Sequence, residues 1–305
     1  MSFLKLAGIG VVSILLTTST LAQTSALAQT STGPLDPKSK AYQKQKSIAK
    51  RDYLNGVTFF KAQKCGPAIE SFDRILKFKS DYAPALKMRG ICLFTVKRFN
   101  EAIDDFNAVL TVKPSDAQSL SYRGEAYENI GLFDRAREDY SQAIKIAPKT
   151  VYPYYLRGHS YAQSLMFSLA IKDFSVVVKA QPKNDAARLF RGMANFRAKK
   201  YHAAIKDFDS AIGMNPKVGL AYYYRAKTKL AIGLVEQTLA DFDKACDLSA
   251  KPLVLSWQNI LISEGLLKSS ATGPSATGPS ATGKCDMATK KALAACAKAQ
   301  CRLVQ

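Results

Sequence analysis

The sequence is organised by a repeat of 34 residues, which limits the chain to architectures in which similar units stack one after another. A small residue recurs at this interval, a second follows twelve residues later, and an aromatic residue follows after four more. The first positions are Gly56, Gly90, Gly124, Gly158, Gly192 and Ala226. The second are Ala68, Ala102, Ala136, Ala170, Ala204 and, as an exception, Thr238. The aromatic positions are Phe72, Phe106, Tyr140, Phe174, Phe208 and Phe242. Six contiguous units therefore run from residue 49 to residue 252, at 49–82, 83–116, 117–150, 151–184, 185–218 and 219–252.

The spacing within a unit predicts two α-helices. In the second half of unit 83–116, Ala102, Ile103, Phe106 and Val109 fall on one side of a helix. A proline closes four units and ends the second helix, because its ring clashes with the preceding turn. These prolines are Pro114, Pro148, Pro182 and Pro216. Each unit is therefore predicted to be a helical hairpin, and the fold class to be all-α.

These hairpins resemble the tetratricopeptide repeat, and the resemblance covers about two-thirds of the chain. It implies a right-handed α-solenoid of six tandem hairpins. Residues 253–268 are similar to the helix that caps such arrays at the C-terminal end. Two units depart from the signature: the last at Ala226 and Thr238, and the first at Ser80, where four units have proline.

An arginine precedes the small residue in five units, and an aspartate stands sixteen residues after each arginine. The pairs are Arg89 and Asp105, Arg123 and Asp139, Arg157 and Asp173, Arg191 and Asp207, and Arg225 and Asp241. The first unit has Asn55 and Ser71 instead, so both charges are absent together. We expect each arginine to pair with the aspartate of its own unit, because a buried unpaired carboxylate is costly. The alternative is a row of arginines that faces a ligand.

Tetratricopeptide arrays generally bind peptides or partner proteins on a concave surface formed by the first helix of each unit. The resemblance therefore implies a partner-binding groove at the family's groove positions. The candidates there are Tyr53, Phe60, Lys87, Phe94, Glu125, Tyr152, Tyr155, His159, Met193, Phe196, Arg197, Tyr223 and Lys227. Further groove positions hold Lys61, Ile91, Glu128 and Asn129.

The residues at these positions indicate the kind of ligand. The family's variant that clamps a C-terminal carboxylate uses asparagine at the ninth position of the unit, together with lysines. Here the ninth positions are Val57, Ile91, Glu125, His159, Met193 and Lys227, so that variant is not supported. An aromatic and apolar groove with scattered charge predicts an extended or helical protein segment as ligand. The alternative for any single aromatic residue is packing between repeats.

The net charge of +20 raises a second possibility, an anionic surface as partner. The units 49–82, 151–184 and 185–218 carry +3, +3 and +4, and lysines also flank the repeats. Attachment to lipid headgroups or a cell-wall polymer is therefore the alternative function. No long basic run is interleaved with aromatic residues, so we expect solvated helix faces and no nucleic acid partner.

The ends of the chain predict export. Residues 1–28 have a charged start, a short apolar core and small residues at Ala26 and Ala28, which is typical of a secretory signal peptide. Cleavage is expected after Ala28 or Ala22, and the alternative is an uncleaved anchor. We expect no transmembrane segment after cleavage, and a periplasmic or extracellular location. The expected segments outside the repeats are a basic, partly helical flank at 29–48, a flexible SATGP linker at 269–284, and a basic cysteine-containing helix at 285–305.

Groups with catalytic potential are scarce. The two histidines, His159 and His202, have no metal-ligand spacing, and no Cys-x-x-Cys pair occurs. We therefore expect no metal, no cofactor and no enzymatic activity. The predicted function is a non-enzymatic scaffold or adaptor that binds a partner protein outside the cytoplasm.

Two cysteines form a candidate disulfide. Cys65 occupies a position that is aromatic or aliphatic in the other units, so it gives up packing area and calls for a compensating interaction. Cys92 lies on the first helix of the next unit, where stacking brings it near Cys65. The alternative is that Cys92 is only a small buried residue. The connectivity of Cys246, Cys285, Cys296 and Cys301 stays open.

Overall fold

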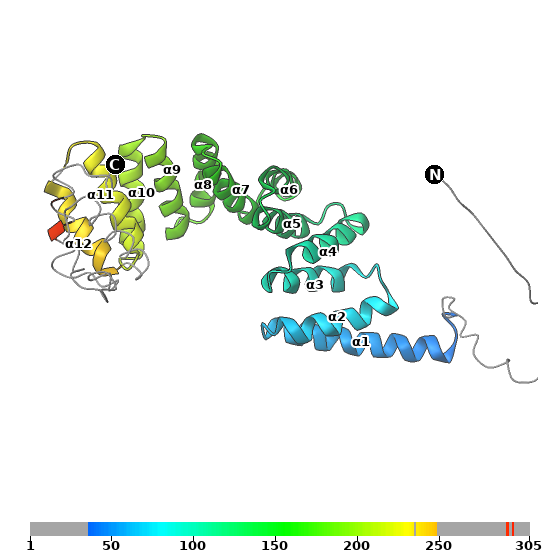
Figure 1. The fold of residues 1–305 in the computed structure, drawn as a ribbon. Coiled ribbons are helices and arrows are strands. Elements are labelled where there is room, and N and C mark those ends of the chain that lie inside the picture. Colours follow the sequence, from blue (N-terminus) through cyan, green and yellow to red (C-terminus); the bar gives the residue numbers. More distant parts are fainter. Residues whose placement is uncertain (1–35, 235, 249–290, 293–294, 296–305) are drawn as a thin grey trace, which may run out of the picture. The chain divides into compact units, whose positions relative to one another are not determined.

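The computed structural model describes residues 36–234, 236–248, 291–292 and 295. In these residues the regular structure is helical throughout (Figure 1). The first helices of the repeats are α1 (Lys40–Lys61), α3 (Ala83–Thr95), α5 (Ala117–Asn129), α7 (Tyr152–Gln163), α9 (Asp185–Arg197) and α11 (Gly219–Ala231). The second helices are α2 (Cys65–Phe78), α4 (Phe99–Val112), α6 (Phe133–Ile146), α8 (Phe167–Ala180), α10 (Tyr201–Met214) and α12 (Leu239–Leu248), the last preceded by a 3₁₀ turn, Glu236–Thr238.

The chain divides after Ser47 into two units, 1–47 and 48–305. In the described part of the first unit, a turn precedes the start of α1. The backbone N–H of Lys38 donates to Asp36 Oδ1 at 3.0 Å, and the N–H of Tyr42 donates to Ser39 Oγ at 3.1 Å. Ser39 therefore caps the helix, since its hydroxyl satisfies an N–H that has no partner in the first turn.

The second unit is a stack of helical hairpins. Each of α3, α5, α7, α9 and α11 packs on the helix that follows it, and α2, α4, α6, α8 and α10 pack on the first helix of the next hairpin. The first helices also contact one another directly, α3 with α5, α5 with α7, α7 with α9 and α9 with α11. The fold is thus an all-α solenoid, as predicted, and its first helices form a continuous row.

The recurrent glycine and aromatic residue meet inside each of the first five hairpins. A Cβ atom added to Gly124 would lie 2.5 Å from the ring of Tyr140, closer than real Cβ contacts. Equivalent contacts at 2.7–3.1 Å join Gly56 to Phe72, Gly90 to Phe106, Gly158 to Phe174 and Gly192 to Phe208. The aromatic rings are fully buried, so the missing side chain of glycine lets the two helices approach over a filled core.

The second helices end at one position of the repeat, with or without proline. Helices α4, α6, α8 and α10 each end two residues before the repeat's proline. Helix α2 ends at the equivalent residue, Phe78, although Ser80 replaces the proline there. The proline therefore marks the end of the hairpin but is not required to produce it.

The turn inside each hairpin has a residue with positive φ. At this position the units have Gln63, Lys97, Gly131, Leu165, Lys199 and Gly233, with φ between 57° and 81°. Glycine adopts this conformation without steric cost, whereas the other residues do so at a penalty. Leu165 is the most unusual member, since it is apolar and its exposed fraction is 65%.

The last hairpin differs from the others at its second helix. A 3₁₀ turn that ends at Thr238 precedes α12, where the other units have an unbroken α-helix. Thr238 is fully buried at the position that alanine occupies elsewhere. A β-branched residue with a hydroxyl group fits this crowded α-helical position less well than alanine.

Several predicted segments lie outside the described residues. These are the signal peptide 1–28, the start of the flank 29–48, the capping helix 253–268, the linker 269–284 and most of 285–305, with Cys285, Cys296 and Cys301.

Candidate functional site

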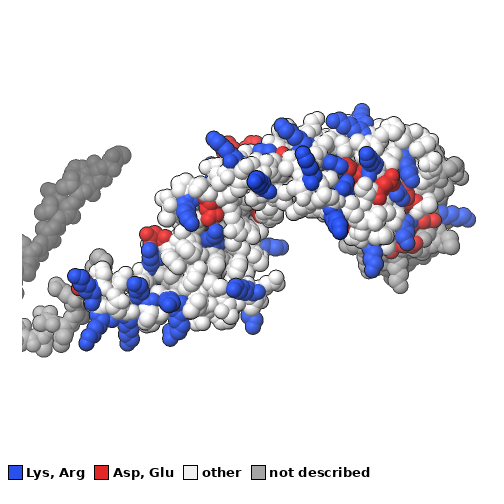
Figure 2. Space-filling model, turned by 180° about the vertical axis from the view of Figure 1, so that it is seen from behind, with Lys and Arg blue, Asp and Glu red and all other residues white. Residues whose placement is uncertain are grey.

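Basic side chains are spread over the described surface. In the face drawn in Figure 2, Lys and Arg occur along the whole described part of the chain, with fewer Asp and Glu among them. Many of these cations have a carboxylate partner within the fold. The arginines of the repeat signature show this most clearly.

All five predicted Arg–Asp pairs are present. In each pair, the arginine Nε and Nη2 donate to the two carboxylate oxygens of the aspartate sixteen residues later. The aspartates are buried, with exposed fractions of 5% or less. The hydrogen bonds that Arg89 donates to Asp105 raise the pKa of Arg89 above its ordinary value, so this guanidinium stays charged. These cations hold the hairpins together and do not form a ligand-binding row.

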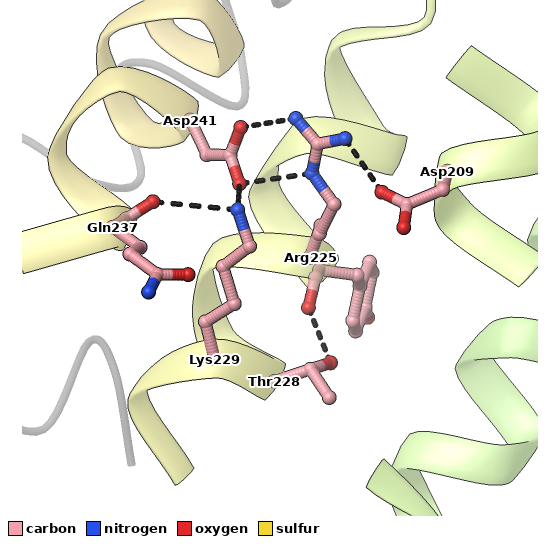
Figure 3. A network of polar contacts seen from close by, with 7 residues as sticks. Asp209, Arg225, Thr228, Lys229, Gln237 and Asp241 are labelled. Carbon is pink, nitrogen blue, oxygen red and sulfur yellow. Dashed lines mark hydrogen bonds and ion pairs between the residues drawn. The ribbon is translucent and has the colours of Figure 1, made fainter. Parts of the chain in front are cut away.

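The remaining guanidinium nitrogen of each arginine, Nη1, donates a hydrogen bond to a residue of the preceding hairpin. This contact between hairpins was not predicted from the sequence. Arg225 Nη1 donates to Asp209 at 2.7 Å, and Lys229 Nζ adds a contact of 2.9 Å to Asp241 (Figure 3). The equivalent acceptors for the other arginines are Asp73, Asn107, Ser141 and Ser175. Each arginine therefore links its own hairpin to the one before it.

Two adjoining cavities open on the row of first helices. The first has a volume of about 350 Å³ and is lined by Glu125, Glu128, Asn129, Tyr155, Leu156, His159 and Gln163. The second has a volume of about 230 Å³ and is lined by His159, Ala162, Gln163, Leu165, Phe167, Phe190, Met193, Ala194, Arg197 and Tyr224. Because His159 and Gln163 line both, the cavities form one groove across α5, α7, α9 and α11. We call it the inner groove.

Two carboxylates line the first cavity. Glu125 Oε1 accepts a hydrogen bond of 2.7 Å from the hydroxyl of Tyr152. Burial raises the pKa of Glu125 to about 7, against the lowering effect of this hydrogen bond and with a further rise from Glu128. Glu128 Oε2 accepts from the hydroxyl of Tyr140 at 3.0 Å, whereas Glu128 Oε1 is buried without a donor.

His159 lies beside these carboxylates but does not hydrogen-bond to them. Its Nδ1 is 3.7 Å from Glu128 Oε1, which is too long for a hydrogen bond. The amide Nε2 of Gln163 is 2.9 Å from the same Nδ1 and can donate to it. The two carboxylates therefore lack a close cationic partner among the described residues.

Cations stand at the other end of the inner groove. The guanidinium of Arg197 lies 5.7 Å from the ring centre of Phe167. The ammonium of Lys227 lies 5.8 Å from the rings of both Phe196 and Tyr223. Burial, and then repulsion from Arg197, lower the pKa of Lys227. Both cations rest on aromatic rings, and neither has a carboxylate partner within the described chain.

The structure separates the predicted groove residues into two groups. Glu125, Tyr155, His159, Met193 and Arg197 line the cavities, as do Glu128 and Asn129. Tyr152 joins them through its hydrogen bond to Glu125, and Lys227 stands beside them on α11. The inner groove is thus concentrated on the third to sixth hairpins.

The other predicted residues take part in packing or pairing. Tyr53 packs against Phe72 and Tyr82, and Phe94 packs against Phe99 and Tyr122. Phe196 packs against Tyr201 and Tyr224, Tyr223 against Phe242, and Phe60 against the first core cluster. Lys87 forms an ion pair of 3.0 Å with Asp116. The alternative of packing between elements therefore applies to these aromatic residues.

Some lining residues were missed because they occupy the sixth position of the unit. Leu156, Phe190 and Tyr224 share this position and all line the inner groove. The groove positions implied by the resemblance omit it. Comparison of the units could have found it, since three consecutive repeats have a large apolar or aromatic residue there.

Cys65 and Cys92 are neighbours, as predicted, but free thiols. Burial and a hydrogen bond with Cys65 raise the pKa of the Cys92 thiol. The disulfide therefore stays a prediction, which peptide mapping of the unreduced protein tests. Recovery of both cysteines in alkylated form without reductant would contradict it.

The described residues include neither a metal site nor a membrane-spanning helix. No group of three or more His, Cys, Asp or Glu side chains there could hold a metal ion. None of the helices described has both the length and the apolar character needed to cross a bilayer.

Comparison with solved structures shows the same architecture elsewhere. A tetratricopeptide repeat protein from Parabacteroides merdae is 19% identical, with a TM-score of 0.62, over 72% of this chain and 88% of that one. YrrB, described as a TPR protein with an unusual peptide-binding site, is 19% identical with a TM-score of 0.54, over 60% and 94%. MamA is 19% identical with a TM-score of 0.52, over 56% and 94%. At these identities the likeness shows the fold.

The fold and the repeat together define the class of protein, a solenoid of helical hairpins. A family model described as tetratricopeptide repeat matches residues 93–149 and 155–219, within the stack of 34-residue hairpins. These residues of the chain are tetratricopeptide repeats. No protein of curated function matches it.

Proposed function

We propose that the protein is a non-enzymatic scaffold that holds a segment of a partner protein along its inner groove. The observation that carries this proposal is the pair of adjoining cavities on the first helices of four consecutive hairpins. Their aromatic walls offer apolar contact area, and their charged and amide groups offer hydrogen bonds to a peptide. The fold that the chain shares with YrrB, whose description includes a peptide-binding site, supports this proposal.

The first cavity offers several hydrogen-bonding groups to a bound peptide. Among the seven described residues that line it, none is a serine, threonine, cysteine or lysine that could act as a nucleophile beside His159. Gln163 holds His159 through a contact of 2.9 Å to Nδ1, and Glu128 lies 3.7 Å from the same nitrogen. We therefore propose no reaction for this site.

The proposed location is outside the cytoplasm, on the basis of the signal-peptide pattern in residues 1–28. Sequencing the N-terminus of the protein from the exported fraction tests it. A mature start at Gln29 or Gln23 is expected. Recovery of the intact chain from the cytoplasm alone would contradict the proposal.

A second candidate function rests on α1. Its residues include Lys40, Lys44, Lys46 and Lys50, all exposed, and its one acidic residue, Asp52, is buried and lies 3.3 Å from Arg74. Such a helix can bind an anionic lipid or wall polymer by charge alone. Binding to anionic vesicles that disappears at 1 M salt, where the Debye length is ~3 Å, would favour this function. Binding in the inner groove, which has apolar and aromatic walls as well as charges, should weaken less at that salt concentration.

Site-specific crosslinking tests the main proposal in cells that make the full chain. A photoreactive amino acid at Gln163, which lines both cavities, should form an adduct with a partner protein. The same amino acid at Lys206, exposed on α10, is the matched control and should form none. Adducts at Lys206 without adducts at Gln163 would place the binding surface on the second helices and contradict the proposal.

A further inference from the structure

The inner groove has opposite charges at its two ends. Glu125 and Glu128 face the first cavity from α5, and Arg197 and Lys227 stand on α9 and α11. Within the described residues, neither pair has an ion-pair partner apart from the long contact of His159 with Glu128. Most other buried or half-buried charges here are paired, as the five Arg–Asp pairs show.

We propose that the partner segment carries a basic side chain that enters the first cavity between Glu125 and Glu128, and an acidic side chain that meets Arg197 and Lys227. The segment then lies in one direction along the inner groove. This inference rests on the proposed function and adds the chemistry of the ligand to it.

The geometry of the first cavity selects a cation. Glu128 Oε1 is buried and has no donor, although its other oxygen accepts from Tyr140. Glu125 and Glu128 also line this cavity without a close cationic partner among the described residues, so a positive charge placed between them would be stabilised. A lysine or arginine side chain supplies both the donor and the positive charge, and a cavity of about 350 Å³ has room for its end. Tyr155 and Leu156 can cover the apolar stem of such a side chain.

His159 does not fill this role itself. With Gln163 donating to Nδ1 at 2.9 Å, the ring has no N–H directed at Glu128. His159 lies instead at the boundary of the two cavities, between the two charged ends. There its ring can contact the backbone of a ligand through both a polar nitrogen and its aromatic face. Phe190 holds the ring edge-on, with 5.5 Å between the ring centres.

The other end selects an anion. Arg197 is exposed, and Lys227 is half-buried against Phe196 and Tyr223. The lowered pKa of Lys227 shows that its charge is poorly solvated and close to another cation. A carboxylate placed between the two would relieve both effects. No ion pair joins the two ends within the described residues, and α7 packs between α5 and α9.

Peptide selection on the immobilised full chain tests the charge pattern. Random peptides of twelve residues displayed on phage serve as the probe. We expect enrichment of peptides that contain both a Lys or Arg and an Asp or Glu. The order of the basic and the acidic residue along the peptide should be the same in all of them. The variant Glu125→Gln with Glu128→Gln keeps both hydroxyl contacts and should lose the basic preference. The matched control is Glu70→Gln with Glu138→Gln, two exposed carboxylates on α2 and α6, and should keep it.

A double-mutant cycle, in which the protein and the peptide are each changed, measures how much binding affinity depends on this charge contact. Replacing the basic residue of a selected peptide by glutamine should weaken binding to the original chain by about tenfold or more, and should have little further effect on the double variant. Additive losses, or selected peptides without a basic residue, would overturn the inference while leaving the inner groove as a binding site. Selected peptides that bind away from the inner groove, or no selected peptides, would overturn the proposed function with it.

One further arm tests whether the occupant is the chain's own basic tail. Lys290→Gln with Lys291→Gln should leave the affinity for the selected peptide unchanged. A rise in affinity would show that the tail competes for the first cavity, and would overturn the assignment of a partner segment.

Discussion

Arg157 holds both oxygens of the Asp173 carboxylate, with Nε and Nη2 at 2.8 and 2.9 Å, and its Nη1 donates to Ser141 Oγ at 2.9 Å. Asp173 lies on α8 and Ser141 on α6, so one guanidinium on α7 joins three helices of two hairpins. The carboxylate is 3% exposed. Loss of either charge would leave the other buried without a partner, which is more costly than the pair is stabilising.

A double-mutant cycle on this pair tests that role. We expect Asp173→Asn and Arg157→Gln each to lower the free energy of unfolding by about 2–4 kcal/mol, and the double variant to lose less than the sum. Urea denaturation measures the three values. As a control, Glu101→Gln at the exposed Arg98–Glu101 pair should leave the midpoint unchanged. Strict additivity of the two single losses would contradict the pairing.

The contact between Gly124 and Tyr140 predicts a position that tolerates no side chain. Gly124→Ala would put a methyl group 2.5 Å from the Tyr140 ring, so we expect a loss of about 1–3 kcal/mol from overpacking. Gly66 on α2 is the matched control, since an added Cβ there meets nothing within 4 Å. The melting temperature should fall for Gly124→Ala, and it should stay unchanged or rise for Gly66→Ala. Equal effects of the two substitutions would show that close packing is not the reason for the glycine.

Leu165 predicts a trade-off between stability and binding. Its φ of 60° is strained for a leucine, its side chain is exposed, and it lines the second cavity. Leu165→Gly should raise stability by roughly 0.5–1 kcal/mol, because glycine accepts positive φ, and should weaken ligand binding. Lys199 also has a φ of 60° but lines neither cavity, so Lys199→Gly relieves the same backbone strain away from the site. It should raise stability without weakening binding. Unchanged binding by Leu165→Gly would remove this residue from the site.

Glu125 predicts a pH effect of defined sign. Its pKa is about 7 in the folded chain and near 4.5 when unfolded, so the folded state holds an extra proton between these values. This contribution to stability is present at low pH and is lost as the pH rises through 7. Glu125→Gln imitates the protonated form. It should be more stable than the original chain at pH 8 by on the order of 2 kcal/mol, and nearly equal to it at pH 4.5. A difference that is the same at both pH values would mean that Glu125 titrates normally.

Structural features whose residues recur in every unit, or nearly every unit, could be predicted from the sequence. The hairpins, the Gly–aromatic contacts and the Arg–Asp pairs each recur at the 34-residue interval, so comparison of the units showed which residues act together. The absence of both charges in the first unit pointed to pairing. The start of α1 at Lys40 and the 3₁₀ turn at Glu236–Thr238 were not predicted, since they occur at the two ends of the array, where the interval no longer constrains the chain.

The inner groove was predicted only in part because its chemistry does not recur. Glu128 is distinguished by its contact with Tyr140 and by an oxygen without a donor, neither of which a sequence displays. Leu165 lines a cavity because of a turn conformation that four non-glycine residues share. The groove positions implied by the resemblance located the surface, but they could not separate Phe94, which packs between elements, from Tyr155, which also lines a cavity.

The central claim is that the ligand lies on the row of first helices, and the two histidines of the chain allow a direct test. His159 lines both cavities, whereas His202 is exposed on α10. Diethylpyrocarbonate modifies accessible histidines, and mass spectrometry reads the two sites separately in the same sample. With a saturating amount of a peptide selected on the full chain, we predict that modification of His159 falls severalfold while that of His202 stays unchanged. Protection of His202 alone, or of neither histidine, would contradict the account.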